Sequence, residues 1–302
     1  MKKKLYGILA AWILSMSTMN YAWSAETIRI YSPYSAGHSA TPAVRKIIDT
    51  ANDSQNIYRF VLEFRPGGNQ TIAVKSIEPD NSVAFIAPAF VENVASKQLN
   101  QSDYVPIYAL GDACWAVVTN KPLKGAKEFT VGGVGFGNAA HLTALALGEQ
   151  YGFQVRYVVF KSNYDALVNM AGNNGVELVI DKYEGYEALR TKNPRLQMVA
   201  ASCPERLLQE PRIKTLKEMG ISAPYIFNIA VAHRDMNPAR QKAIGNILNQ
   251  ATEKLGATEI YRLSAMRPPM FDQVSTQQFY ENSVRLVQTL QEKYKDQIQS
   301  QK

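Results

Sequence analysis

Two short stretches of the sequence combine glycine with hydroxyl, amide and imidazole side chains. They span residues 33–41 and 132–138, and each lies between a strand-like and a helix-like run. Glycine lets the backbone bend sharply, and the first turn of a following helix offers N–H groups at the positive end of the helix dipole. Anions bind at such positions. The two loops together predict one anion-binding site, closed from opposite sides.

We expect ligand contacts from these loops and from the carboxyl ends of neighbouring strands, where open α/β sheets bind ligands. The predicted ligand-binding residues are Tyr34, Ser35, Ala36, Gly37, His38, Ser39, Thr41, Pro88, Gly133, Gly135, Phe136, Gly137, Asn138, His141, Lys161 and Asp181. If His38 points inward, its protonation adds positive charge near pH 6 to 7.

Simpler roles stay open for several of these residues. Asn138 is a suitable N-cap for a tight strand-to-helix turn. His141 can be a packed, hydrogen-bonded side chain, and Asp181 can cap the turn that follows its strand. Lys161 either attracts an anion or lies on the surface. Taken alone, the second loop is an ordinary tight turn, and the paired first loop favours a ligand.

The second loop does not match nucleotide-binding motifs. Gly133, Gly135 and Gly137 lack the spacing of G-x-G-x-x-G, and no lysine follows Gly137 as a P-loop requires. The three histidines do not form the H-E-x-x-H metal motif. We therefore predict neither a cofactor nor a metal.

Catalytic motifs are equally scarce. Residues 37–41 miss the G-x-S-x-G nucleophile elbow, because no glycine stands two places after Ser39. We therefore predict that the protein is not an enzyme. The competing hypothesis is a secreted hydrolase that uses His38 with Ser35 or Ser39.

The N-terminus has the three parts of a secretory signal peptide. Three lysines precede an apolar run over residues 5–16, and small residues follow at Ala22, Ser24 and Ala25. The run is shorter than the roughly 20 residues that a membrane-spanning helix needs. We predict a signal peptide over residues 1–24 and a periplasmic mature protein. Its removal leaves about 278 residues and a net charge of about +4.

Charge and cysteine content narrow the partners. Lysine and arginine are scattered and form no dense run with aromatic residues, which argues against nucleic acid and mildly favours small anions. Cys114 and Cys203 can form one disulfide in an oxidising compartment, or remain two buried thiols.

Strand-like and helix-like runs alternate along the chain, which predicts parallel α/β sheets in two lobes. We assign residues 25–116 and 229–302 to the first lobe and residues 117–228 to the second. Thr41 is the predicted N-cap of the helix that begins at Pro42. The expected strands are 28–31, 58–63, 83–87, 114–119, a strand ending at 132, 155–160, 176–180, 196–200 and 227–232, and the expected helices are 42–51, 72–76, 139–151, 164–170, 183–191 and most of the chain from 238 onward.

The chain also resembles the substrate-binding proteins of tripartite tricarboxylate transporters, the Bug family. The resemblance extends along almost the whole mature chain and rests on the order and spacing of short motifs. These are Pro33-Tyr34-x-x-Gly37 with Arg45 downstream, Glu63-Phe64-Arg65-Pro66-Gly67-Gly68-Asn69, Pro79-Asp80, Gly133-x-Gly135-x-Gly137-Asn138-x-x-His141-Leu142, Phe160-Lys161, Ala166-Leu167, Val176-Glu177-Leu178, Arg206, Pro211 and Thr215-Leu216-x-Glu218-x-Gly220.

The resemblance implies a two-lobed α/β periplasmic binding protein of type II, the Venus-flytrap architecture, with a hinge between the lobes. In the family, backbone N–H groups and ordered waters of two loops hold a ligand carboxylate, and these loops match residues 34–41 and 133–138. The implied partners are a small carboxylate and a membrane permease, with a membrane sensor as the alternative, and the implied oligomeric state is a monomer.

Four positions depart from the family pattern. His38 stands where the family usually has glycine, Thr41 where it has aspartate, Phe64 where it has asparagine and Ser162 where it has glycine. Because the missing aspartate removes a negative charge from the expected pocket, we expect a di-, tri- or aromatic carboxylate and not an amino acid. If Thr41 only caps its helix and His38 points to solvent, specificity is unchanged.

Overall fold

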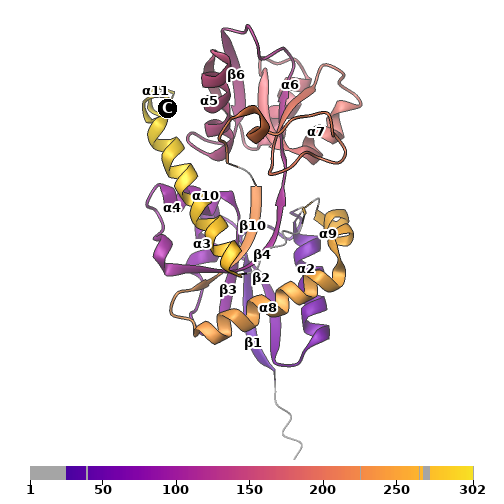
Figure 1. Cartoon of the computed structure of the whole chain (residues 1–302), viewed down its shortest axis with the longest axis vertical. Coiled ribbons are helices and arrows are strands. Elements are labelled where there is room, and N and C mark those ends of the chain that lie inside the picture. Colours follow the sequence, from indigo (N-terminus) through magenta and orange to yellow (C-terminus); the bar gives the residue numbers. More distant parts are fainter. Residues whose placement is uncertain (1–24, 39, 225, 265, 268–272, 302) are drawn as a thin grey trace, which may run out of the picture.

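The computed structural model describes residues 25–38, 40–224, 226–264, 266–267 and 273–301, and it has two lobes stacked along the long axis (Figure 1). Each lobe is built on a five-stranded sheet. The strand order is β2-β1-β3-β10-β4 in the first lobe and β7-β6-β8-β5-β9 in the second. The predicted signal peptide, residues 1–24, lies outside the described residues.

Both sheets are mixed, so the prediction of parallel sheets is wrong in one respect. In the first sheet, β10 runs antiparallel to β3 and β4, and in the second sheet β5 runs antiparallel to β8 and β9. These are the strands that enter each sheet directly after the chain passes from the other lobe. The strands are β1 (Glu26–Ser32), β2 (Tyr58–Phe64), β3 (Ser82–Ile86), β4 (Tyr104–Ala113), β5 (Trp115–Thr119), β6 (Glu128–Gly133), β7 (Gln154–Val159), β8 (Leu178–Lys182), β9 (Gln197–Ser202) and β10 (Ile226–His233).

Helices cover both sheets. Those that pack on the first sheet include α2 and α8, which also contact each other. The helices are α2 (Thr41–Ser54), α3 (Thr71–Lys75), α4 (Pro88–Ala95), α5 (Ala139–Tyr151), α6 (Asn163–Ala171), α7 (Tyr183–Arg190), α8 (Pro238–Leu255), α9 (Ala257–Ser264), α10 (Gln273–Lys293) and α11 (Lys295–Ser300). The sequence analysis did not predict α4 or β4. In α4, Pro88 occupies the first helical turn, where its missing N–H is tolerated.

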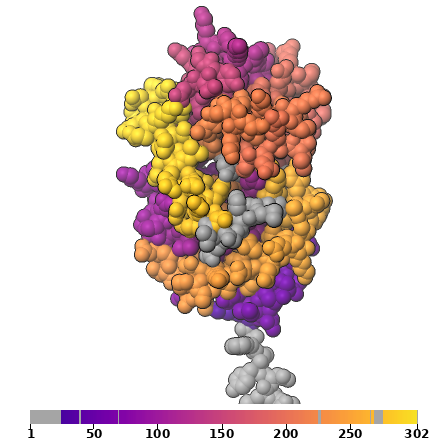
Figure 2. Space-filling model, viewed as in Figure 1, coloured from indigo at the N-terminus to yellow at the C-terminus, as the bar shows by residue number. Residues whose placement is uncertain are grey.

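The C-terminal helices contact both lobes. α10 packs on α4 and β4 of the first lobe and on α5 of the second. At its end, Lys293 Nζ lies 2.5 Å from Glu149 Oε2 on α5, and the Tyr294 hydroxyl donates a hydrogen bond to the same oxygen over 2.6 Å. Figure 2 shows this segment, in yellow, covering one side of the junction between the lobes.

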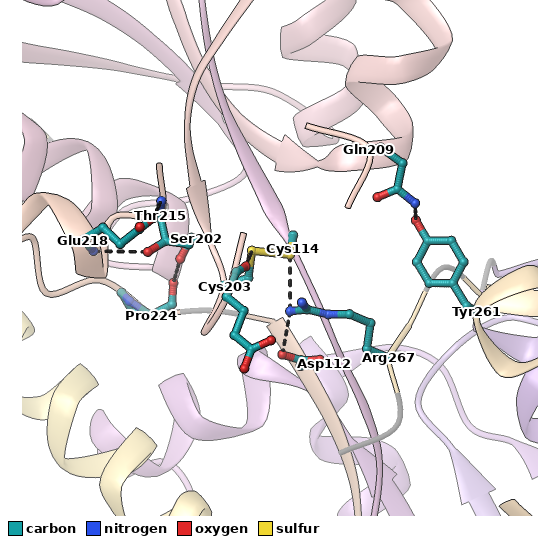
Figure 3. The surroundings of a disulfide bond; sticks show 11 residues. Asp112, Cys114, Ser202, Cys203, Gln209, Thr215, Glu218, Pro224, Tyr261 and Arg267 are labelled. Atoms are coloured by element: carbon teal, nitrogen blue, oxygen red, sulfur yellow. Dashed lines mark hydrogen bonds and ion pairs between the residues drawn. A yellow bond between two sulfur atoms is a disulfide. The ribbon is translucent and has the colours of Figure 1, made fainter. Parts of the chain in front are cut away.

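A disulfide between Cys114 and Cys203 ties together the two places where the chain leaves a sheet to cross between lobes (Figure 3). Cys114 stands between β4 and β5, and Cys203 directly follows β9. The Cα atoms are 4.9 Å apart. Beside the disulfide, the Arg267 guanidinium lies 3.1 Å from Asp112 Oδ2. Of the two open alternatives for the cysteines, the structure shows the disulfide. Among the described residues, no helix combines the length and apolar character that crossing a membrane requires.

Candidate functional site

The first loop connects β1 to α2 and presents two stacked rings. The Tyr34 and His38 ring centroids are 3.8 Å apart with an interplanar angle of 9°. The Tyr34 hydroxyl donates a hydrogen bond to the Asn228 side chain on β10, and His38 Nδ1 accepts the N–H of Ala40 over 3.1 Å. These bonds fix both rings against the first lobe.

The top of the same loop is open to solvent. Ser35, Ala36 and Gly37 are exposed, and none of their N–H groups donates a hydrogen bond to another described residue. Ser39 lies outside the described residues. The prediction that Thr41 caps α2 is wrong: Ala40 is at the N-cap, and the Thr41 hydroxyl donates to the Ser35 carbonyl over 3.1 Å. The Thr41 side chain therefore holds the loop at Ser35, while the N–H groups of residues 35–37 stay without a bond to another described residue.

Lys182, at the end of β8 in the second lobe, lies close enough to His38 to act on it electrostatically. Burial and then the charge of Lys182 lower the pKa of His38 to about 4. In this conformation His38 is therefore neutral at pH 6 to 7, where the sequence analysis expected it to gain a proton. The sequence analysis missed Lys182, although it directly follows the predicted site residue Asp181.

Acidic groups flank Lys182 within its own lobe. Burial lowers the pKa of Lys182, and the charges of Glu184 and Asp181 oppose that effect. Burial also raises the pKa of Asp181, which is 8% exposed, against the backbone and charge of Lys182. The end of β8 thus combines one buried ammonium group with two carboxyl groups whose charges partly oppose the effect of its burial.

The second loop connects β6 to α5 and is bonded within the protein. Asn138 Oδ1 caps α5 by accepting the His141 N–H over 2.9 Å, as predicted for a capped turn. His141 Nδ1 accepts the Gly137 N–H over 2.9 Å. Burial lowers the pKa of His141 to about 4, so the ring is neutral and able to accept this bond. His141 is fully buried and stacks on Tyr157, which fits the packed alternative.

Tyr157, on β7, covers the glycines of this loop. A Cβ atom at Gly133 would overlap with the Tyr157 hydroxyl, so glycine is required there. The same hydroxyl interacts with the Gly135 backbone and with the Asn138 side chain. Burial raises the pKa of Tyr157 above its usual range, which keeps the phenol neutral.

A carboxyl group from the first lobe reaches the N-terminus of α5. Glu92, on α4, accepts the N–H of Ala139 at its Oε1 over 2.9 Å. Burial raises the pKa of Glu92 to about 7, and the Ala139 N–H partly opposes this shift. Sequence reasoning missed Glu92, because it lies on a helix that was not predicted.

The remaining predicted residues occupy different places. Pro88 and Glu92 line a small cavity next to Ala139, while the Phe136 ring centroid lies 5.8 Å from that of Tyr157. Lys161 is exposed on the surface beyond β7. The charge of Lys182 thus acts on the first loop at His38, and the second loop is joined to α4 through the bond between Ala139 and Glu92.

Three comparisons place this architecture among known proteins. A TctC solute-binding protein from Polaromonas has 17% identity and a TM-score of 0.74, over 90% of this chain and all (100%) of that one. MatC from Rhodopseudomonas palustris, solved with bound malate, has 13% identity and a TM-score of 0.64, over 88% of this chain and 98% of that one. An R. palustris protein solved with adipate has 14% identity and a TM-score of 0.69, over 89% and 97%.

The chain has the fold of the TctC solute-binding proteins. This confirms the two-lobed α/β fold that the sequence resemblance implied. No protein-family model matches the chain, and no curated protein sequence matches it.

No group of three or more His, Cys, Asp or Glu side chains in the described part of the chain is arranged to hold a metal. No hydrogen bond in that part joins the Ser35 hydroxyl to His38, and His38 Nδ1 is taken by Ala40. The arrangement suits recognition of an anion by N–H groups and an ammonium group.

Proposed function

We propose that the chain is a non-catalytic periplasmic receptor that captures a small di-, tri- or aromatic carboxylate between its lobes. The mature protein, released from a signal peptide over residues 1–24, acts as a monomer. It delivers the ligand to the permease of a tripartite tricarboxylate transporter.

The first loop carries this proposal, because Ser35, Ala36 and Gly37 are exposed and their N–H groups bond to no other described residue. The charge of Lys182, from the other lobe, acts on His38 of this loop. Burial and Lys182 keep His38 neutral in this conformation, so Lys182 supplies the positive charge of the site. A carboxylate bound beside the two residues would pair with Lys182 and favour protonation of His38. The disulfide fits an oxidising compartment such as the periplasm.

The neighbours with bound ligands support the same ligand class. Malate and adipate are each dicarboxylates, and the proteins solved with them share this fold. We infer from the fold and from the first loop with Lys182, and not from sequence identity, that this chain takes a ligand of related chemistry.

Titration calorimetry and thermal shift across a panel of malate, adipate, citrate and benzoate test the proposal, with a neutral sugar and a polyamine as controls. A ligand at a thousand times its Kd stabilises the protein by about 4 kcal/mol. If the sugar or the polyamine stabilises the protein and no carboxylate does, the ligand class is wrong.

A pair of lysine variants locates the site. Lys182→Met removes a charged partner, so we expect the Kd of the best acid to rise roughly 10- to 100-fold. Lys192→Met, an exposed lysine of the same lobe, serves as the matched control and leaves Kd unchanged. Equal affinities for both variants would remove Lys182 from the site.

Delivery and catalysis need separate measurements. Uptake of the labelled acid by cells with and without this chain tests delivery to a permease. If uptake is unchanged while a transcriptional response to the acid disappears, the partner is a membrane sensor. Turnover of any panel compound that is lost in His38→Ala would establish the hydrolase instead.

A further inference from the structure

Glu92 connects the lobes by a hydrogen bond between its carboxyl group and a backbone N–H at the start of a helix. It lies on α4, which packs with α10 and β10 in the first lobe, and Ala139 opens α5 in the second lobe. Figure 1 shows α4 in the lower lobe and α5 in the upper one. The 2.9 Å hydrogen bond from Ala139 N–H to Glu92 Oε1 therefore spans the junction.

This is the position in which a helix N-terminus binds an anion. Neighbouring donors of the same loop are already used, since the Gly137 N–H bonds to His141 and the His141 N–H bonds to Asn138. The loop that the sequence predicts as a carboxylate site thus has a carboxyl group of the protein itself at its helix end.

We propose that the Glu92 carboxyl group occupies the position at the N-terminus of α5 that a ligand carboxylate would otherwise take. By filling this position, which we call the stand-in role of Glu92, it holds the second lobe on the first. The carboxylate of the solute then binds to the first loop and Lys182. This last consequence rests on the proposed function, whereas the interlobe role of Glu92 does not.

The groups around Glu92 leave its carboxyl as the main titrating partner. Tyr157 faces it from β7 and is neutral, and His141 on α5 is neutral above a pKa of about 4. Lys295 on α11 lines the same cavity. Because a carboxyl oxygen accepts an N–H bond whether or not the group is ionised, the contact with Ala139 persists on both sides of the Glu92 pKa.

A small acid in solution can reach this position. Glu92 and the loop from Val134 to Asn138 line an open cavity of about 500 Å³, whose far wall is formed by Gln291, Lys295, Ile298 and Gln299. Removing the Glu92 side chain therefore leaves a space, next to the released Ala139 N–H, that is open to formate.

Chemical rescue tests the proposal on the ligand-free protein. We expect Glu92→Ala to lower Tm by about 3 to 6 °C and to increase the radius of gyration in solution scattering, because the lobes part. Formate at tens of millimolar should restore at least half of the Tm loss in Glu92→Ala. Glu253→Ala, an exposed glutamate on α8, is the matched control and should show neither the loss nor the rescue beyond wild type.

Two conservative variants keep the test decisive if Glu92→Ala does not fold. At pH 5, where Glu92 is protonated, Glu92→Gln retains an oxygen acceptor and should match wild type, whereas Glu92→Met retains the size without an acceptor and should lose Tm and compactness. If formate shifts wild type, Glu92→Ala and Glu253→Ala equally, or if Glu92→Met behaves as wild type, the stand-in role is wrong. Neither result depends on whether the organic acid panel finds a ligand.

Discussion

The two glycine loops look alike in sequence and differ in what their N–H groups do. In the first loop, Ser35, Ala36 and Gly37 are exposed and their N–H groups bond to no other described residue. In the second loop, the N–H groups of Gly137 and Ala139 bond to His141 and Glu92. A glycine loop before a helix is a ligand site only where the protein leaves its donors unused.

The difference arises from what packs on each loop. β7 supplies Tyr157, α4 supplies Glu92, and Gln291 on α10 donates a hydrogen bond to the Gly137 carbonyl over 3.1 Å. The first loop instead has the charge of Lys182, at the end of β8, acting on His38. The second loop is part of the lobe junction, whereas the first loop keeps exposed N–H groups that we propose bind the solute.

The disulfide joins the two segments that cross between the lobes carrying the glycine loops. Breaking it should cause the largest loss of stability among these predictions. The Cys114–Cys203 disulfide closes a separation of 89 residues. Chain entropy assigns about 4 to 5 kcal/mol of stability to a loop of this length. Denaturant unfolding of wild type with and without reductant measures this contribution. The double variant that combines Cys114→Ser and Cys203→Ser measures it independently. A loss below about 1 kcal/mol would show that packing alone holds the crossings.

A pair of glycine substitutions tests the comparison directly. Gly133→Ala puts a Cβ into the Tyr157 hydroxyl, so we expect a loss of about 2 to 3 kcal/mol from overpacking. Gly37→Ala meets no atom within 4 Å and should change stability by less than about 0.5 kcal/mol. Urea unfolding of both variants measures the contrast. Similar losses in the two would mean that the first loop is as tightly packed as the second.

The sequence predicted most elements, but not which loop donors are used. Short continuous apolar runs located β1, β3 and β8 to within about two residues, because strands that are buried on both faces form such runs. The antiparallel placement of β10 was not predictable, since strand direction depends on how the chain crosses between lobes. Likewise, nothing local to Asn138 reveals that Glu92, far away in sequence, bonds next to it.

The pH dependence of stability sharpens the account of the second loop. Burial raises the pKa of Glu92 to about 7, so its contribution is fully present below its ordinary value near 4.5 and is lost as pH rises through 7. His38 and His141, with lowered pKa values, act oppositely and lose stability below about 6.5.

Comparing wild type with Glu92→Gln cancels these histidine contributions, together with that of Tyr157. We expect wild type to lose about 1 to 3 kcal/mol relative to Glu92→Gln between pH 5 and pH 8. Chemical denaturation at both pH values measures this difference. Parallel stability curves for the two proteins would place the carboxyl in a solvent-like environment.

The first loop should report ligand binding through proton uptake, the smallest of these effects. In this conformation His38 has a pKa of about 4, which burial and Lys182 cause. A carboxylate bound between the two would raise the pKa of His38, because an opposite charge favours the imidazolium. Binding near pH 6 should then take up as much as about one proton, and none at pH 8.

Calorimetry in buffers of different ionisation enthalpy counts these protons, and His38→Gln should abolish the uptake while the exposed control Lys192→Met keeps it. Because uptake at pH 6 means that affinity rises as pH falls, Kd should decrease in parallel. If binding is tight but releases or exchanges no proton, His38 stays neutral in the complex. Lys182 and the open N–H groups of the first loop would then bind the carboxylate without an imidazolium.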